Sequence, residues 1–126
     1  HVSRERRITR VRRVSRVQEQ LAGAHEIDAK LRDVRAQSAL DVRGALLELH
    51  GSREQLAVVR ERLAFAEQEV EQARERFRAG VAGNADVISA LLSLNQARTV
   101  RNDALAAYQT ARVSLARAIG AVQEIP

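Results

Sequence analysis

The histidines and carboxylates of this sequence could bind a metal or perform acid-base chemistry, and their spacing decides whether they do. The histidines are His1, His25 and His50. None has a second histidine four residues away, the spacing that puts two ligands on one helix face. No nucleophile lies at a suggestive spacing from a base, and the glycines at 80 and 83 do not form a phosphate-binding loop. We therefore predict that the chain is not an enzyme and holds no metal or cofactor.

Positive charge is concentrated at the start of the chain. Residues 1–20 contain seven arginines and two glutamates, which accounts for the whole net charge of +5, because the remaining 14 basic and 14 acidic residues cancel. Such a segment could contact phosphates or anionic lipid headgroups. It has no aromatic residues to stack on bases, so this signal does not favour nucleic-acid binding. We interpret residues 1–12 as a basic arm or the end of a fragment.

The composition favours helix over sheet. One proline, three aromatic residues and 45% apolar content indicate an all-α chain with room for one domain. No run of eighteen apolar residues occurs, and no apolar stretch follows the charged N-terminus, so we expect neither a membrane span nor a secretory signal in this sequence. Cysteine is absent, which excludes disulfides and thiolate metal sites.

From residue 42 onward, apolar residues follow a heptad repeat. One core position holds large residues, and a second, three residues later, holds mostly small ones. The large residues are Val42, Leu49, Leu56, Leu63, Val70 and Phe77, then Val87, Leu94, Tyr108, Leu115 and Val122. The small set is Ala45, Ser52, Val59, Ala66 and Ala73, then Ala90, Ala97, Ala104, Ala111 and Ala118. Only Arg101 interrupts the pattern, and the alanines predict two closely packed helices.

A short glycine-containing segment separates the two heptad regions. Gly80 suits the left-handed conformation that ends helices, Asn84 is a good N-cap, and Asp86 puts a carboxylate in the first turn of the next helix. Because the heptads match and the connection is short, residues 13–126 are predicted to form an antiparallel coiled-coil hairpin. We expect a first helix over about residues 13–79, a tip at 80–85 and a second helix over about 86–120.

The first predicted helix is about twice as long as the second, so its N-terminal half has no partner within the chain. That half still carries an apolar stripe, formed by Val14, Val17, Leu21, Ala24, Ile27, Leu31 and Val34. The second helix has further apolar residues away from the seam, namely Leu91, Leu92, Val100, Leu105, Val113 and Ile119. We expect other helices, from further copies or from a longer parent chain, to cover this surface.

The residues around the turn resemble those of a known family. The pattern is Phe77-x2-Gly80-x5-Asp86-Val87-Ile88-x-Ala90, followed by Asn95-x-Ala97 and Tyr108. Together with Asp41-Val42-Arg43 upstream and Ala116-x-Ala118-Ile119-Gly120 downstream, it is similar to the C-terminal repeat hairpin of TolC-type outer-membrane efflux proteins. The similarity covers about residues 40–120, is weak over 13–39 and is absent before that. It implies that the hairpin is a fragment of a TolC-like α-helical barrel.

The resemblance also implies a function. Hairpins of a homotrimer would assemble a periplasmic duct that passes substrates from an inner-membrane pump through the outer membrane. The hairpin tip would dock a periplasmic adaptor, or membrane fusion, protein, and the pump would be reached only indirectly. Contact with the membrane would be made through barrel strands that this sequence lacks, so we expect the chain to be the C-terminal portion of a longer protein.

Particular residues take roles by the same resemblance. Adaptor contact is expected at Ala79, Gly80, Val81 and Ala82. Asp86 matches an acidic position that forms a ring at the entrance, where three like charges would favour cations. The residues expected to pack at the tip and along the seam are Phe77, Val87, Ala90, Leu94, Ala97 and Tyr108.

The sequence departs from the family at three tip positions. Some members place there a tyrosine, an arginine and a second aspartate, which lock the entrance by polar contacts. This chain has Phe77, Ala82 and Ser89 instead. Closure would therefore depend on packing and on Asp86.

Two other functions remain compatible with the residues. A soluble coiled-coil interaction or scaffold module needs only the heptads, and it would tolerate any change at Gly80 or Asp86 that keeps the turn. A nucleic-acid-binding module would use the arginines of residues 1–16 and would lose affinity steeply with salt.

Overall fold

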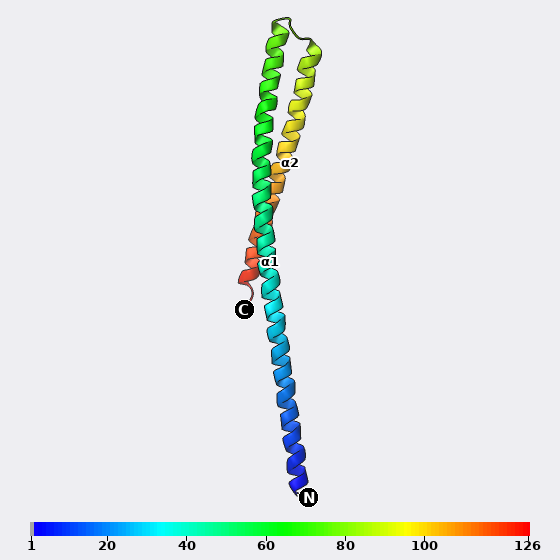
Figure 1. Cartoon of the computed structure of the whole chain (residues 1–126), viewed down its shortest axis with the longest axis vertical. Helices are drawn as coiled ribbons and strands as arrows, with labels where there is room; N and C mark the ends of the chain where they lie inside the picture. The colour runs from blue at the N-terminus through cyan, green and yellow to red at the C-terminus, as the bar shows by residue number, and fades with distance from the viewer. Residues whose placement is uncertain (1) are drawn as a thin grey trace.

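The computed structural model describes residues 2–126 and shows two antiparallel helices joined by a short turn (Figure 1). Helix α1 spans Val2–Arg78, and helix α2 spans Asn84–Gln123. At 1.5 Å per residue the helices are about 115 and 60 Å long. The predicted all-α hairpin, with a long first and a shorter second helix, is confirmed. Helix α1 already begins at Val2, so residues 2–12 continue the helix, while residue 1 of the basic arm lies outside the described residues.

The two helices meet along the heptad seam. Between residues 42 and 73, every residue of α1 that is buried or half-buried occupies one of the two predicted core positions. The buried residues are Ala45, Leu56, Val59, Leu63, Ala66, Val70 and Ala73 of α1, and Leu94 and Ala111 of α2. Leu63, Ala66, Val70 and Leu94 form the core cluster, against which Ala90, Leu91 and Ala97 pack. The heptad register predicted from the sequence is confirmed for residues 42–73, whereas the predicted core residue Val122, near the end of α2, is 40% exposed.

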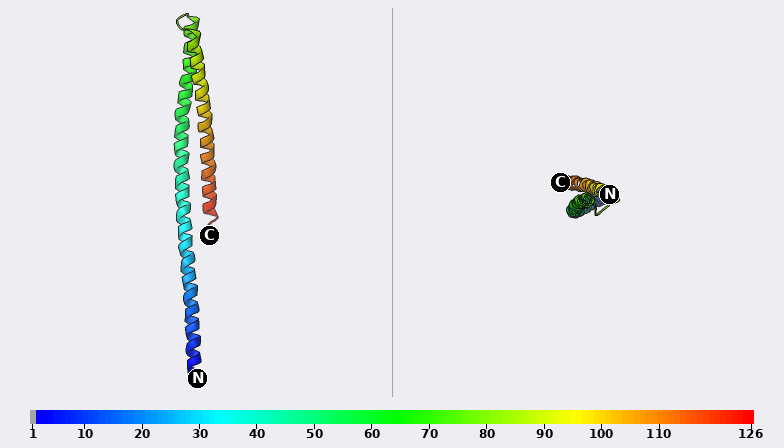
Figure 2. Two further views of the ribbon diagram at one scale, coloured as in Figure 1. Left: turned by 90° about the vertical axis from the view of Figure 1, so that its right-hand side faces the viewer. Right: turned by 90° about the horizontal axis from the view of Figure 1, so that it is seen from above.

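The partner of α1 ends well before α1 does. Beyond the end of α2, the Arg35 guanidinium donates a hydrogen bond of 2.7 Å to the Pro126 carbonyl oxygen. Residues 2–34 of α1 extend past this point without a neighbouring helix (Figure 2). The molecule is therefore a pair of packed helices over most of the length of α2, and a single helix over residues 2–34 of α1.

The turn uses a specific helix-ending motif. Gly80 has a φ of 72°, the left-handed conformation expected for it. The Gly80 amide donates to the Phe77 carbonyl at 3.1 Å, and the Val81 amide donates to the Arg76 carbonyl at 2.9 Å. These two bonds define a Schellman motif, which satisfies carbonyls that the helix end would leave unpaired.

The start of α2 differs from the expectation for Asn84. The N-cap is Gly83, with extended φ and ψ of −84° and 169° and no side-chain cap, and Asn84 is the first helical residue. Asn84 therefore lies one position too far along the chain to cap the helix, and that prediction was wrong. Asp86 does lie in the first turn of α2, as predicted, where its carboxylate faces the positive end of the helix dipole.

Candidate functional site at the hairpin tip

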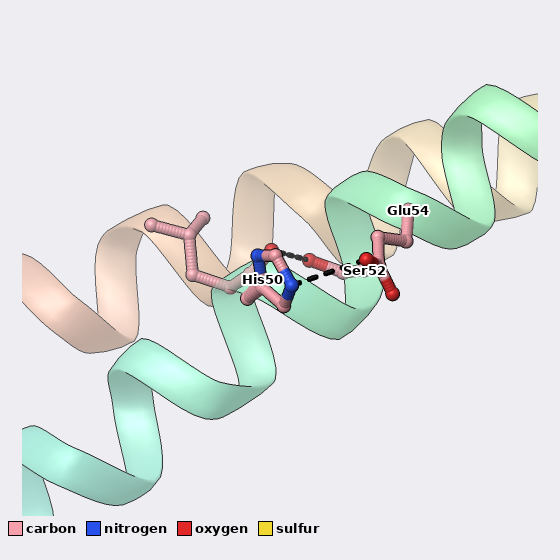
Figure 3. Close-up of polar contacts among 4 residues, drawn as sticks. His50, Ser52 and Glu54 are labelled. Carbon is pink, nitrogen blue, oxygen red and sulfur yellow. Dashed lines mark hydrogen bonds and ion pairs between the residues drawn. The ribbon is translucent and has the colours of Figure 1, made fainter.

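Acid-base groups along α1 form surface contacts rather than a catalytic cluster. His50 Nε2 lies 3.1 Å from Glu54 Oε1, one helical turn away, and both side chains are 70% exposed (Figure 3). The Ser52 hydroxyl donates to the Leu49 carbonyl at 3.0 Å. Among residues 2–126 no group of three or more His, Cys, Asp or Glu side chains is arranged to hold a metal ion. His1 lies outside the described residues.

The residues expected to contact an adaptor form the apex of the hairpin. Ala79, Gly80 and Val81 are exposed, and Ala82 is half-buried. Val81 is the most exposed large apolar residue of the described chain, with 78% of its surface accessible. An apolar side chain at an apex gains nothing from the fold of the hairpin itself, so it is available for contact with another molecule.

Asp86 lines a shallow groove that the sequence did not predict. The groove lies between the helices just below the apex and is lined by Glu69, Gln72, Ala73, Arg76, Asp86, Ser89, Ala90 and Ser93. Its charged residues are two acids and one arginine, which leaves one net negative charge. On the α2 side its lining includes Ser89, Ala90 and Ser93, whose small side chains leave room for a partner helix to approach. The groove depends on how the two helices are placed, which the linear sequence does not show.

Five of the six residues expected to pack at the tip and seam are buried or half-buried. Leu94 is 6% exposed, and Val87, Ala90, Ala97 and Tyr108 are half-buried. The Arg112 guanidinium carbon lies 5.9 Å from the centre of the Tyr108 ring, within the range of a cation–π contact.

Phe77 is the exception. It is 49% exposed, because it lies in the last turn of α1, beside the Schellman motif, where this chain does not enclose it. With Val81 and Ile88, which is 51% exposed, it makes the end of the hairpin apolar. Of the two other positions that depart from the family, Ala82 is half-buried and Ser89 lines the groove.

A second apolar stripe runs along α1 on the side away from α2. It consists of Leu40, Leu47, Val58 and Phe65, which are 59%, 74%, 44% and 64% exposed. Leu40 and Leu47 occupy the heptad position that lies five residues after a large core residue, as Leu47 does relative to Val42. Val58 and Phe65 occupy the position that lies two residues after a large core residue, here Leu56 and Leu63. In a heptad with 3.5 residues per turn these positions lie roughly 150° around the helix from the seam.

Helix α2 repeats this feature. Leu92 and Val113 lie five residues after the core residues Val87 and Tyr108, and they are 65% and 50% exposed. Both outer edges of the hairpin therefore carry exposed apolar residues. The surplus of apolar residues on α2 was predicted from the sequence, but the outer stripe of α1 was not. Its signal was the seven-residue spacing between Leu40 and Leu47 and between Val58 and Phe65.

The stripe of the single segment is exposed as well. The large apolar residues of residues 2–34 that are at least half exposed are Val2, Ile8, Val11, Val14, Val17, Leu21, Ile27 and Val34. None of the described residues in this segment is buried. Within the part of the chain that the structure describes, neither helix is apolar over a sufficient length to cross a membrane.

Comparison with known proteins adds one finding. The family model described as "Outer membrane efflux protein" matches residues 9–121, nearly the whole chain. No curated protein and no solved structure matches the chain significantly.

Proposed function

Because this chain belongs to the outer membrane efflux protein family, we propose that it forms part of the wall of a trimeric efflux duct and docks an adaptor through its tip. Members of the family are outer-membrane efflux channels rather than enzymes, and they work as trimers with adaptor and pump partners. The placement of this segment in the periplasm and the roles of its residues are our proposal.

The observation that carries this proposal is the apolar stripe on each outer edge of the hairpin. In a two-stranded coiled coil only the seam is covered, and the positions opposite it are normally polar. Here those positions hold residues such as Leu47, Phe65, Leu92 and Val113, which are at least half exposed. A ring of helices gives every helix a neighbour on both sides, so it buries both edges of each hairpin. This favours a duct wall over a free-standing scaffold module.

The tip supplies the docking surface in this proposal. Exposed apolar contact comes from Val81 and Phe77, and the adjacent groove offers carboxylates at Glu69 and Asp86. An adaptor helix with small apolar residues and a few basic or amide side chains would complement both features. Ala79, Gly80 and Ala82 have little or no side chain, which lets a partner backbone come close.

Asp86 is proposed to act at the entrance. In a trimer three copies of its carboxylate would lie near the axis and would favour passage of cations over anions. Phe77, Ala82 and Ser89 contribute no charge, so the closed entrance would depend on apolar packing of Phe77 and Val81 with their counterparts in the other copies.

The absence of cysteine from residues 1–126 allows a direct test of docking. A single cysteine is introduced at Ala82, in the protein expressed from its own gene, and a short bifunctional reagent is applied to whole cells. We expect a crosslink to a periplasmic adaptor, identified by mass spectrometry. Arg53→Cys, on the exposed surface of α1 far from the tip, serves as the control and should give no such product.

Two results would overturn the proposal. One is an equal yield of adaptor product from both cysteines. The other is the behaviour expected of a soluble scaffold: the protein is missing from the cell envelope fraction, and deletion of its gene leaves the sensitivity of the cells to exported compounds unchanged.

A further inference from the structure

The two broad faces of the hairpin lie on either side of the seam. Because each residue advances about 100° around a helix, a residue directly before a heptad core residue lies on one broad face, and a residue directly after one lies on the other. The groove below the apex agrees with this placement. It brings together Glu69 and Arg76 of α1 with Asp86 of α2, and each of these precedes a core residue. We call this side the Asp86 face and the opposite side the arginine face.

The two faces differ in charge. Over residues 41–123 the arginine face has seven arginines and two glutamates, whereas the Asp86 face has three arginines and five acidic residues. Three further glutamates, at positions 54, 61 and 75, lie on the outer edge of α1. The arginines of the arginine face, all of them exposed, are Arg43, Arg53, Arg60, Arg74, Arg78, Arg98 and Arg112. Its glutamates are Glu67 and Glu71, so this face has a clear positive excess.

Two arginines of this face have no acidic partner in the described chain. Ion pairs on a helix form between residues three or four apart, and Arg60 and Arg98 have no acidic residue at that spacing. Within residues 2–126 neither of them makes an ion pair or a side-chain hydrogen bond. Arg74 differs, because its guanidinium lies 3.1 Å from the Glu71 carboxylate.

Arg60 and Arg98 lie at about the same level along the hairpin. Val59 of α1 and Ala97 of α2 line the same groove, and the two arginines follow them directly in the sequence. Like charges on adjacent helices repel each other, and an anion bound over both would replace that repulsion by attraction. The fold therefore presents an unneutralised pair of guanidinium groups on one surface.

The proposed duct, on which this inference rests, fixes the direction of the two faces. Neighbouring helices cover the outer edges of each hairpin, so one broad face lines the lumen and the other faces the periplasm. Asp86 is proposed to lie near the axis at the entrance, which places the Asp86 face toward the lumen. The arginine face then points outward, over about 50 Å from Arg43 to Arg78 at 1.5 Å per residue.

We propose that the outward arginine face binds the carboxylates of the peptidoglycan that surrounds the duct where it crosses the cell wall. The peptide stems of this polymer carry free carboxyl groups, and a guanidinium can bind a carboxylate through two parallel hydrogen bonds. Arg53 and Arg60 are seven residues, or roughly 10 Å, apart along α1. A flexible polymer with repeated carboxylates can reach arginines at such intervals without a preformed groove.

An acidic helix of the adaptor is a poorer occupant of this face. The adaptor proposed for the tip has basic or amide side chains, which complement Asp86 but are repelled by arginines. A docked helix also needs a continuous apolar stripe to pack on. On α2 the arginine face interrupts its leucines, Leu91 and Leu105, with Arg98 and Arg112.

The test measures cosedimentation of the 126-residue chain with purified peptidoglycan, in its native form and after its carboxyl groups have been amidated. The chain should sediment with the native form only, and less so as salt is raised. The variant Arg60→Gln/Arg74→Gln/Arg98→Gln should lose roughly tenfold in affinity, about two- to threefold for each arginine.

The matched control is Arg62→Gln/Arg76→Gln/Arg117→Gln, which removes the same charge from exposed positions of the Asp86 face. It should lose less than about twofold in affinity, because these side chains point away from the polymer that the arginine face binds. Circular dichroism of both triple variants should show unchanged helix content.

Three results would overturn the proposal. Equal loss in the two triple variants would show that net charge alone explains binding. Equal binding to native and amidated peptidoglycan would show that carboxylates are not recognised. In whole cells, an adaptor crosslink from Arg98→Cys as strong as that from Ala82→Cys would show that the adaptor, rather than the cell wall, covers this face.

The peptidoglycan inference and the proposed duct fail in different ways. Absent binding of the parent chain to native peptidoglycan, with an intact adaptor crosslink from Ala82→Cys, would remove only the peptidoglycan inference. A missing crosslink with carboxylate-dependent binding would remove the duct, and with it the assignment of the arginine face to the outside of a duct wall.

Discussion

Two regions of the molecule carry similar apolar patterns but differ in how far these residues are buried. The paired region consists of residues 42–73 of α1 together with α2, and the single region consists of residues 2–34 of α1. In the paired region Val59 is 1% exposed and Ala111 is fully buried. In the single region Val14 and Leu21 are 51% and 55% exposed, although their spacing is equally regular. The same kind of pattern is thus buried only where the chain itself supplies a partner. The single region and the outer edges are better explained by an assembly larger than this chain.

The strongest contrast between the regions should appear on truncating a leucine. Leu94→Ala removes a 6% exposed side chain from the core cluster and should destabilise the chain by about 2–5 kcal/mol. Leu92→Ala, two residues away and 65% exposed, should change stability by less than about 0.5 kcal/mol. Thermal and urea unfolding followed by circular dichroism measures both. Equal losses would contradict the heptad register.

Enlarging a small seam residue should have the next largest effect. Ala111 is fully buried between the helices, so Ala111→Leu should force them apart at a cost of about 1–3 kcal/mol. Ala107→Leu adds the same side chain at an exposed position of the same helix and is the control, with little expected change. A seam that accepts leucine at residue 111 without loss in the unfolding midpoint would show that the close approach of the helices is not required.

Replacement by alanine should change the stability of the chain in opposite directions at Gly51, which lies within α1, and at Gly80, which lies in the turn. Gly80→Ala places a Cβ in a left-handed conformation, with a φ of 72°, and should cost about 1–2 kcal/mol. Gly51 lies in regular helix with nothing within 4 Å of an added Cβ. Gly51→Ala should therefore stabilise the chain by up to about 1 kcal/mol. Urea unfolding gives the sign of the change in unfolding free energy for each variant and so checks the Schellman turn. If both alanine variants were more stable than the parent chain, the Schellman turn would be excluded.

The smallest effect is expected in the single region. Val14→Ala removes an exposed side chain that touches no other helix, so the unfolding free energy of the isolated chain should stay within about 0.5 kcal/mol of the original. A loss of several kcal/mol would mean that residues 2–34 already pack against a partner in solution, which would erase the contrast between the regions.

Much of this architecture could be predicted from the sequence because it depends on local and periodic signals. The heptads specified which residues of α1 are buried between Val42 and Ala73, and the glycine at residue 80 specified the turn. The helical conformation of residues 2–12 was not predicted, because they continue the helix without any heptad partner. Asn84 was misplaced as N-cap because Gly83, one residue earlier, already adopts the extended conformation that a cap requires.

The candidate site was less accessible to sequence reasoning. Asp86 and the apex residues were named through family resemblance, whereas the groove that Asp86 lines also includes Arg76 and Glu69 of α1. Only the relative placement of the two helices brings these side chains together. Phe77 fits the heptad but lies in the last turn of α1, so its spacing alone could not show that it stays half exposed.

The central claim is that neighbouring helices cover the outer edges of the hairpin in an outer-membrane assembly. Its most direct test is the maleimide labelling rate of Leu47→Cys, at a position that is 74% exposed in the single chain. The rate is compared between the isolated 126-residue chain and the protein assembled in its own membranes, with Arg53→Cys as reference. We predict fast labelling of residue 47 in the isolated chain and a rate at least about tenfold lower in the assembly. Equal rates in the two states would contradict the claim.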